Sequence, residues 1–279
     1  MRRLALVLIL FCCPALMAGQ YSDLYVIPVA GHVTGADGNT WMSDVAIQNI
    51  QSTPLTVQLV LIRSGEGMSD NIGSLSTVTI PANGTRILRD VMSGMSPTLG
   101  AIMVGADRPF ALSSRAYNAN AAGATQGQSV TPLRDFLDNT LATSDLSNAT
   151  AYVAGLTSNS HYRTNLGFVA GSAASGLTLE VTLRGADGST LGTGRFTIPP
   201  SGFEHVQFSS TSITNQTFDE ASATYRIVSG SGTVAPYASV VDALSGAAFF
   251  IGGQFPPNAP FPSSTTAFRL LFDQMRLAQ

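Results

Sequence analysis

Three histidines, His32, His161 and His205, are the first candidates for chemistry in this chain. A histidine can serve a serine nucleophile as general base, and two histidines at close, regular spacing can bind zinc. The chain contains no HExxH and no GxSxG motif, and its histidines lie far apart in the sequence. We therefore expect no catalytic residue, no metal site and no cofactor, in a protein that is not an enzyme. The alternative is a hydrolase whose site is assembled from distant residues.

A nearly identical hexapeptide occurs twice, as GADGNT from Gly35 and as GADGST from Gly185. Aspartate beside glycine is found in calcium loops, but it is also a strong signal for a tight hairpin turn. No regular series of acidic residues follows either copy, and the copies fall at different places in the internal repeat described below. This pattern predicts two turns, with a calcium site as the alternative.

Trp41 and Tyr162 are the candidate ligand-binding residues, because they occupy equivalent positions in that repeat. Each stands where a predicted strand begins beside a loop, and a flat aromatic ring there can stack on a sugar ring. The alternative is that each ring covers the end of its own core. Asp44 and Asn165 follow at equivalent positions, and we expect them to hold loops by accepting hydrogen bonds from backbone amides.

An internal repeat must position these residues. WMSDVAIQN from Trp41 matches YRTNLGFVA from Tyr162, and later segments match in the same order. LTVQLVLI and LTLEVTL alternate between apolar and polar residues, which is typical of antiparallel strands with one buried face. About seven such segments per copy predict an all-β fold of two tandem antiparallel β-sandwich domains. The Ile-Pro pairs in each copy should mark strand ends.

The arrangement resembles the tandem immunoglobulin- or fibronectin-like β-sandwich modules of secreted bacterial proteins. The resemblance rests on VIPVAGHVTG, YRTNLGFV, TIPANGTRIL and PYASVVD, and it extends over residues 25–256. The two-unit architecture and the missing catalytic motifs lead us to expect a binding or structural module at the cell surface or in the extracellular space, with a protein or a polysaccharide as partner. A carbohydrate-binding protein that uses Trp41 and Tyr162 is the sharper alternative.

The pattern divides the chain into five parts. These are a signal peptide (1–19), repeat 1 (24–134), a linker (135–150), repeat 2 (151–256) and a proline-rich segment with an amphipathic tail (257–279). Thr131 and Pro132 followed by Leu133, Phe136 and Leu137 predict a short helix leading into the linker. A stripe formed by Phe268, Leu271, Phe272 and Met275 predicts a second short helix in the tail.

The N-terminus predicts export. Two arginines precede an apolar run and small residues, which is typical of a secretory signal peptide cleaved near residue 19. The alternative is a lipoprotein signal at Cys12 or Cys13. We expect a secreted protein, extracellular, periplasmic or on the cell surface, with no transmembrane span in its mature form. All 14 basic residues are arginine and the net charge is −3, which argues against a nucleic-acid partner.

A reductant should leave the thermal midpoint of the mature protein unchanged. The reason is that cleavage near residue 19 removes Cys12 and Cys13, the only cysteines of the chain. Thermal unfolding with and without dithiothreitol measures the effect. A midpoint that falls in dithiothreitol would show that the cysteines are retained in a disulfide, contrary to the predicted cleavage.

Overall fold

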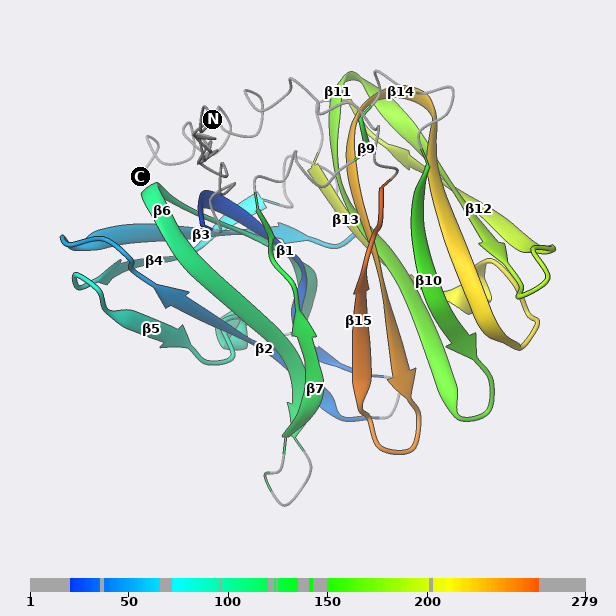
Figure 1. Ribbon diagram of the computed structural model, residues 1–279, viewed down its shortest axis with the longest axis horizontal. Coiled ribbons are helices and arrows are strands. Elements are labelled where there is room, and N and C mark those ends of the chain that lie inside the picture. Colours follow the sequence, from blue (N-terminus) through cyan, green and yellow to red (C-terminus); the bar gives the residue numbers. More distant parts are fainter. Residues whose placement is uncertain are drawn as a thin grey trace, which may run out of the picture.

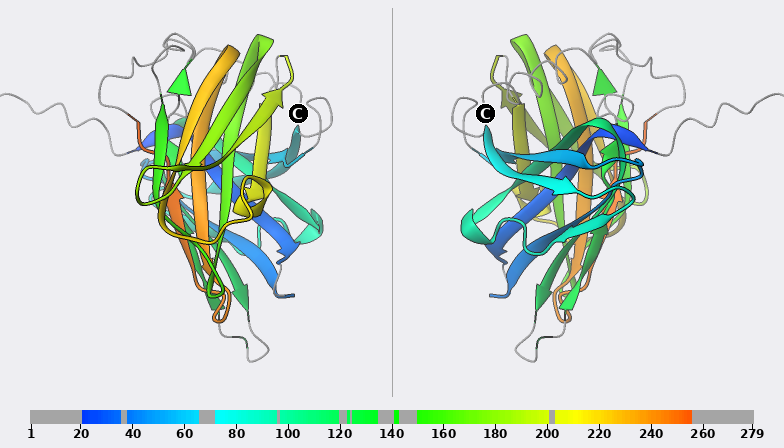
Figure 2. Two further views of the ribbon diagram at one scale, coloured as in Figure 1. Left: turned by 90° about the vertical axis from the view of Figure 1, so that its right-hand side faces the viewer. Right: turned by 90° about the vertical axis from the view of Figure 1, so that its left-hand side faces the viewer.

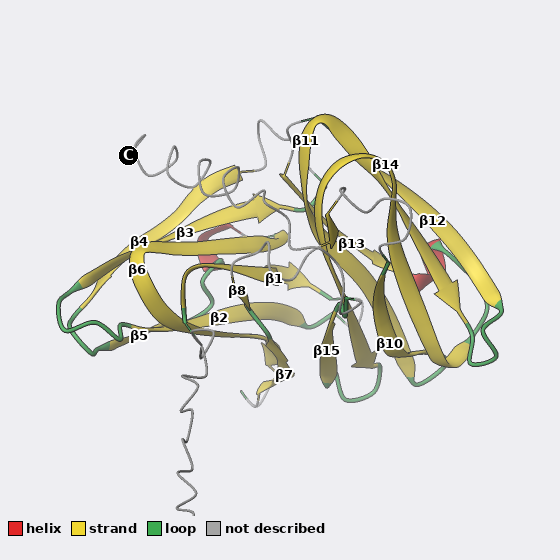
Figure 3. Ribbon diagram, turned by 45° about the horizontal axis from the view of Figure 1, so that its top comes forward, coloured by secondary structure: helices red, strands yellow, loops and turns green. Residues whose placement is uncertain are grey.

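The computed structural model of the protein describes residues 21–35, 38–65, 72–95, 97–119, 123, 125–134, 141–142, 150–200 and 203–255. Within these ranges the chain is all-β, and its only helical segments are two 3-10 turns, Ser93–Met95 and Ser210–Ser212 (Figure 3). Neither turn approaches the length that a helix needs to cross a membrane.

Unit 1 is an eight-stranded antiparallel sheet. Its strands are β1 (Ser22–Thr34), β2 (Thr40–Gln48), β3 (Leu55–Arg63), β4 (Ile72–Ile80), β5 (Thr85–Leu88), β6 (Thr98–Ala119), β7 (Thr125–Val130) and β8 (Leu133–Arg134). The order is β4-β3-β6-β1-β2-β5, with β7 on β6 and β8 on β1. The first half of β6 pairs with β1 and β3, and its second half pairs with β2 and β7. The long strand β6 thereby links two groups of strands around one core.

Unit 2 repeats this plan in seven strands. They are β9 (Leu141–Ala142), β10 (Ala151–Ser158), β11 (Tyr162–Arg184), β12 (Thr190–Ile198), β13 (Phe203–Ser209), β14 (Phe218–Asp242) and β15 (Ala248–Gly252). The order is β10-β14-β11-β12, with β13 on β11 and both β9 and β15 on β14. Strand β11 is a single strand, whereas the matching segments of unit 1 form two separate strands, β2 and β3. The long pair β11–β14 is the spine of the unit (Figure 1).

Strand register shows the repeat directly, because residues matched in sequence also face equivalent partners across the strands. The equivalent pairs are Trp41–Asn118 with Tyr162–Asp242, and Leu55–Ile80 with Leu177–Ile198. Ile80 and Ile198 are the last residues of β4 and β12, so the prediction that the two matched Ile-Pro pairs mark strand ends is confirmed, whereas Ile27-Pro28 lies within β1 at a shift of register.

The two hexapeptides are turns, as predicted. In both, the amide of the first glycine donates to the carbonyl of the fifth residue, and the amide of the fourth residue donates back to the first carbonyl. The fourth residues, Gly38 and Gly188, have φ of 81° and 80°, a backbone conformation that favours glycine. One turn joins β1 to β2 and the other joins β11 to β12, so the copies serve different hairpins.

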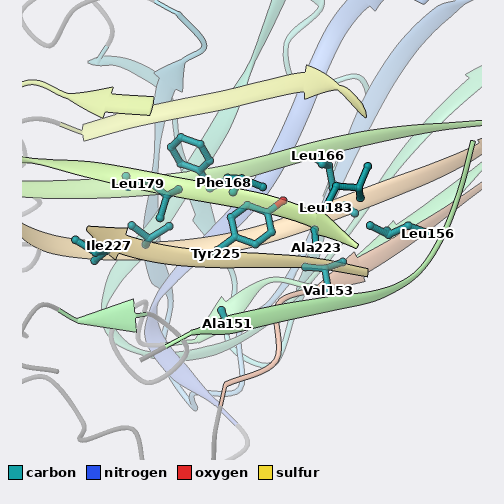
Figure 4. Close-up of a cluster of buried hydrophobic side chains, with 14 of the residues drawn as sticks. Ala151, Val153, Leu156, Leu166, Phe168, Leu179, Leu183, Ala223, Tyr225 and Ile227 are labelled. Atoms are coloured by element: carbon teal, nitrogen blue, oxygen red, sulfur yellow. The ribbon is translucent and has the colours of Figure 1, made fainter. Parts of the chain in front are cut away.

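Each unit buries the apolar face of its alternating strands. In unit 2, Leu179 and Leu183 of β11 pack with Tyr225 and Ile227 of β14, and all four are almost fully buried (Figure 4). In unit 1, the odd-numbered residues of β3 from Leu55 to Leu61 are buried in the same way. Burial of each such side chain contributes about 1.5–3 kcal/mol, which makes these clusters the main source of stability.

A third apolar cluster joins the two units, which lie side by side (Figures 1 and 2). Its buried members are Val26, Val60, Ile62, Ala101 and Met103 of unit 1 with Val169 and Ala235 of unit 2. Next to it, Tyr237 of β14 extends into the core of unit 1. Gly167 faces Tyr237 across the strands, and a Cβ there would overlap the tyrosine ring. The units are therefore docked through packed side chains.

The predicted helix at the start of the linker is wrong. Leu133 and Arg134 form strand β8, which pairs with Val26 and Tyr25 of β1. The Thr-Pro signal for a helix start depends only on neighbouring residues. Pairing with β8 satisfies backbone groups of β1, and this tertiary interaction outweighs the helix signal. Leu133 also packs against the cluster between the units. The rest of the predicted linker helix, the tail helix and the signal peptide lie outside the described residues.

Candidate functional site

The two units carry polar side chains at equivalent positions on the same face of their sheets. In unit 1 these are Arg89, Asp44 and Arg115, here called the charged row. In unit 2 they are Ser209, Asn165 and Ser239, here called the neutral row. Strand pairing sets both rows, because Asp44 faces Arg115 as Asn165 faces Ser239.

The charged row is centred on a buried carboxylate. One oxygen of Asp44 accepts hydrogen bonds from Arg89 Nη1 at 2.6 Å and from Arg115 Nε at 3.0 Å, and it forms an ion pair with Arg115 Nη2 at 2.9 Å. The other oxygen accepts from the Tyr117 hydroxyl at 3.1 Å and from the Asp90 amide at 2.9 Å. The amide contact is of the kind expected from sequence; the arginine and tyrosine contacts were not foreseen.

These contacts determine the ionisation of the row. Burial by itself raises the pKa of Asp44, but hydrogen bonds from the Asp90 amide, Arg89, Arg115 and Tyr117 outweigh it and hold the pKa below its ordinary value. Burial and the adjacent Asp44 charge raise the pKa of Tyr117. At neutral pH the row therefore contains two cations and one anion.

A cavity of about 520 Å³ lies over the charged row, between β5, β2, β6 and β7. The Arg115 guanidinium lies over the Tyr117 ring, 4.1 Å from its centre, and both residues line the cavity. Ile87 is another lining residue and is half exposed. The cavity combines cationic, hydroxyl and apolar surface.

The neutral row lines a different space, a cleft of about 350 Å³ between the units. All three residues of the row contribute to its wall, together with Gln207 of β13. Trp41 of β2 lines the cleft from unit 1, with its ring also packed against the unit 1 core. The two sides are tied together by Ser239, whose hydroxyl donates to Gln128 Oε1 of β7 at 3.0 Å.

The structure does not place both predicted ligand-binding residues in this cleft. Trp41 is a lining residue, but Tyr162 is not, although its neighbour Arg163 is. Tyr162 is 36% exposed and pairs with Asp242 at the end of β11. Successive residues of a strand point to opposite faces, so Arg163 and Tyr162 diverge. The part that Tyr162 plays in binding stays a prediction.

The three histidines occupy three unrelated environments. His32 Nδ1 contacts the Asp90 carboxylate at 2.9 Å, and His161 is exposed in a turn. His205 is fully buried, with Nε2 at 2.7 Å from the Tyr237 hydroxyl oxygen, and burial lowers its pKa to about 3. In the part of the chain that the structure covers, no histidine is hydrogen-bonded to a serine hydroxyl, and no group of three potential metal ligands occurs.

No family model and no curated protein sequence matches the chain. A Pleurotus ostreatus lectin in complex with GalNAc aligns with 88% of this chain and 89% of the lectin, at 10% identity and a TM-score of 0.22. The apo form of that lectin aligns at 9% identity and a TM-score of 0.18, covering 88% of this chain and 87% of the lectin. A biofilm-associated protein domain aligns at 11% identity and a TM-score of 0.17, covering 86% of this chain and 68% of the domain. TM-scores of this size establish neither a shared fold nor a shared site.

Proposed function

We propose that the chain is an exported, non-enzymatic binding module of two immunoglobulin-like units that holds an uncharged carbohydrate in the cleft between them. The observation that supports this best is the position of Trp41. Unit 1 presents its indole ring in the same cleft as the hydroxyl and amide groups of unit 2, with Arg163 of unit 2 as a further lining residue. Export is proposed from the signal-like N-terminus, independently of the cleft.

The cleft has the chemistry that a neutral sugar requires. A sugar ring has an apolar C–H face, on which an indole can stack, and a rim of hydroxyl groups that both donate and accept hydrogen bonds. Asn165 and Gln207 supply side-chain amides that also donate and accept, and Ser209 and Ser239 supply hydroxyls. The volume of about 350 Å³ lies at the lower end of the range for ligand pockets, which suits a short glycan segment.

Replacement of Trp41 by alanine should weaken carbohydrate binding by about tenfold, since the stacking surface is lost. Trp41 is the only tryptophan of the chain, so its fluorescence reports directly on occupation of the cleft. We would titrate the mature protein with a panel of neutral oligosaccharides, follow Trp41 fluorescence, and confirm affinities by calorimetry. Trp41→Phe retains an aromatic ring and should keep more of the affinity than Trp41→Ala.

Tyr152→Ala is the matched control, because Tyr152 is an aromatic residue of unit 2 that is 48% exposed and does not line the cleft. Tyr162→Ala tests whether a bound glycan extends beyond the cleft to the other predicted aromatic. A panel in which no sugar alters Trp41 fluorescence, or equal affinity of Trp41→Ala and Tyr152→Ala, would contradict the carbohydrate proposal. Turnover of a bound sugar would contradict the non-enzymatic part.

A further inference from the structure

We propose that the charged row of unit 1 is a second binding site, which takes a carboxylate or sulfate-ester group carried by a sugar. It lies on unit 1 and contains two arginines, whereas the cleft lies between the units and is lined by one, Arg163. Two guanidinium groups surround one carboxylate, so the row has one positive charge in excess, in a chain whose net charge is −3. An anion bound there would restore neutrality.

The arginines have hydrogen-bond donors to spare. Arg89 uses Nη1 on Asp44, and Arg115 uses Nε and Nη2 on the same oxygen of Asp44. Each guanidinium has five N–H donors, and the two side chains remain 64% and 42% exposed. Asp44 thus fixes both planar groups without using all their donors. Pre-ordered guanidinium groups bind planar or tetrahedral oxyanions well, since little side-chain entropy is lost on binding.

The remainder of the cavity suits a hydroxylated scaffold better than a bare ion. Ser113 and Ser129 line it beside the arginines, and Ile87 adds apolar surface. Gln126 is also a lining residue, and its Oε1 atom is buried without a hydrogen-bond partner in the described part of the chain. A ligand hydroxyl would satisfy that acceptor. At about 520 Å³ the cavity is far larger than a sulfate or carboxylate group.

The repeat itself argues that the arginines are not needed merely to hold the sheet together. Unit 2 has the same strand register with Ser209, Asn165 and Ser239 at the equivalent positions, and no ion pair occurs there. Unit 2 has its own carboxylate between two arginines, Glu180 with Arg195 and Arg226, but at a different place, so the fold does not require the ion pairs at the Asp44 position. In unit 2 the same face is covered by unit 1 and lines the cleft.

The test is calorimetry of the mature protein at low salt with four ligands: a uronate oligosaccharide, a sulfated oligosaccharide, an uncharged oligosaccharide of equal length, and sodium sulfate. We expect at least one anionic oligosaccharide to bind, more weakly as salt is raised, and the two anionic ligands distinguish carboxylate from sulfate ester. Arg89→Gln should weaken that binding by about tenfold, because a charge-assisted contact is lost. Arg89→Lys keeps the charge but not the planar fork of donors, so its affinity should lie between those of the unsubstituted protein and Arg89→Gln.

Arg86→Gln is the matched control, because Arg86 is an exposed arginine of β5, three residues before Arg89, that does not line the cavity. It should change the affinity by less than about twofold, because an exposed charge that does not line the cavity makes no hydrogen bond to the ligand and acts on it only through water. Equal weakening by Arg86→Gln and Arg89→Gln, or equal binding of the uncharged oligosaccharide, would overturn the proposal. So would sodium sulfate binding as tightly as the sulfated sugar. An anionic ligand that quenches Trp41 fluorescence and binds Arg89→Gln as tightly as the unsubstituted protein occupies the cleft. That result would also overturn the proposal of a second site.

Discussion

Acidification from pH 7 to pH 5 should lower the free energy of unfolding by roughly 2 kcal/mol on account of His205 alone. His205 is completely buried between the units, and burial lowers its pKa to about 3. In the unfolded chain the pKa is about 6.5, so between these two values the unfolded state binds the extra proton. Stability is therefore complete above about pH 6.5 and falls as the pH decreases toward 3, by about 1.4 kcal/mol per unit.

The environment of His205 explains why protonation is resisted. Its Nε2 atom is bonded to the Tyr237 hydroxyl, and that hydroxyl donates to Gln207 Oε1 at 3.2 Å. Its other nitrogen, Nδ1, is buried without a partner among the described residues, so an added proton there would have no acceptor. Glu204, the preceding residue, has its pKa raised by burial, so it opposes the effect of His205 at lower pH.

Urea unfolding of the protein at pH 7 and pH 5 measures the change, with Trp41 fluorescence as the signal. His205→Gln should remove most of the difference between the two pH values, whatever its own cost in stability. His161→Gln should keep the difference, because His161 is exposed. If His205→Gln and the unsubstituted protein respond equally to acid, His205 is not the group responsible.

The sequence predicted the repeat well because strand register is strongly constrained. A slip of one residue would move every apolar side chain of a half-buried strand to the wrong face. Residues matched by alternation in the two halves were therefore bound to occupy equivalent positions, as Leu55 and Leu177 do opposite Ile80 and Ile198. The prediction of a linker helix was wrong because it used only neighbouring residues, whereas Leu133 pairs with β1, a strand far away in the sequence.

The docking of the units was missed, although a signal for it is present. Val60 and Ile62 lie on the face of β3 opposite Leu59 and Leu61. The prediction of a strand with one buried face placed that opposite face in contact with solvent. The run from Leu59 to Ile62 is in fact apolar on both faces, which is typical of a strand buried on both sides. The structure covers this outer face with unit 2.

The charged row could be predicted only in part. Asp44 and Asn165 were matched, but the arginines lie 45 and 71 residues from Asp44 in sequence, Arg89 in the turn after β5 and Arg115 in β6. The sequence signal that was available is the alternation of residues between the two faces of a strand. Once β2 is paired with β6, Arg115 lies directly opposite Asp44 on the same face. Which face stays open depends on how the units dock, and alternation within a single unit contains no information about that.

Replacement of Asp44 by alanine should destabilise the protein by about 3 kcal/mol, because it removes the buried partner of several hydrogen-bonded groups. The Asp44 side chain is 5% exposed, and its two oxygens accept from Arg89, Arg115, Tyr117 and the Asp90 amide. Both arginines reach solvent, so they regain hydration when the carboxylate is lost. The larger part of the cost comes from the Tyr117 hydroxyl and the Asp90 amide, which lose their acceptor.

Asn165→Ala is the internal control that the repeat provides, since Asn165 occupies the equivalent position of unit 2 and forms no ion pair there. It should cost less than about 1 kcal/mol. Urea unfolding at pH 7 compares the two variants, and Asp44→Asn, which keeps one acceptor but loses the charge, should lie between them. The contribution of Asp44 is present above its ordinary pKa and is lost as the pH falls through the lowered folded pKa, so the gap between unsubstituted protein and Asp44→Asn should narrow in acid. Equal costs for Asp44→Ala and Asn165→Ala would show that the charged row adds nothing to stability beyond what the neutral row provides.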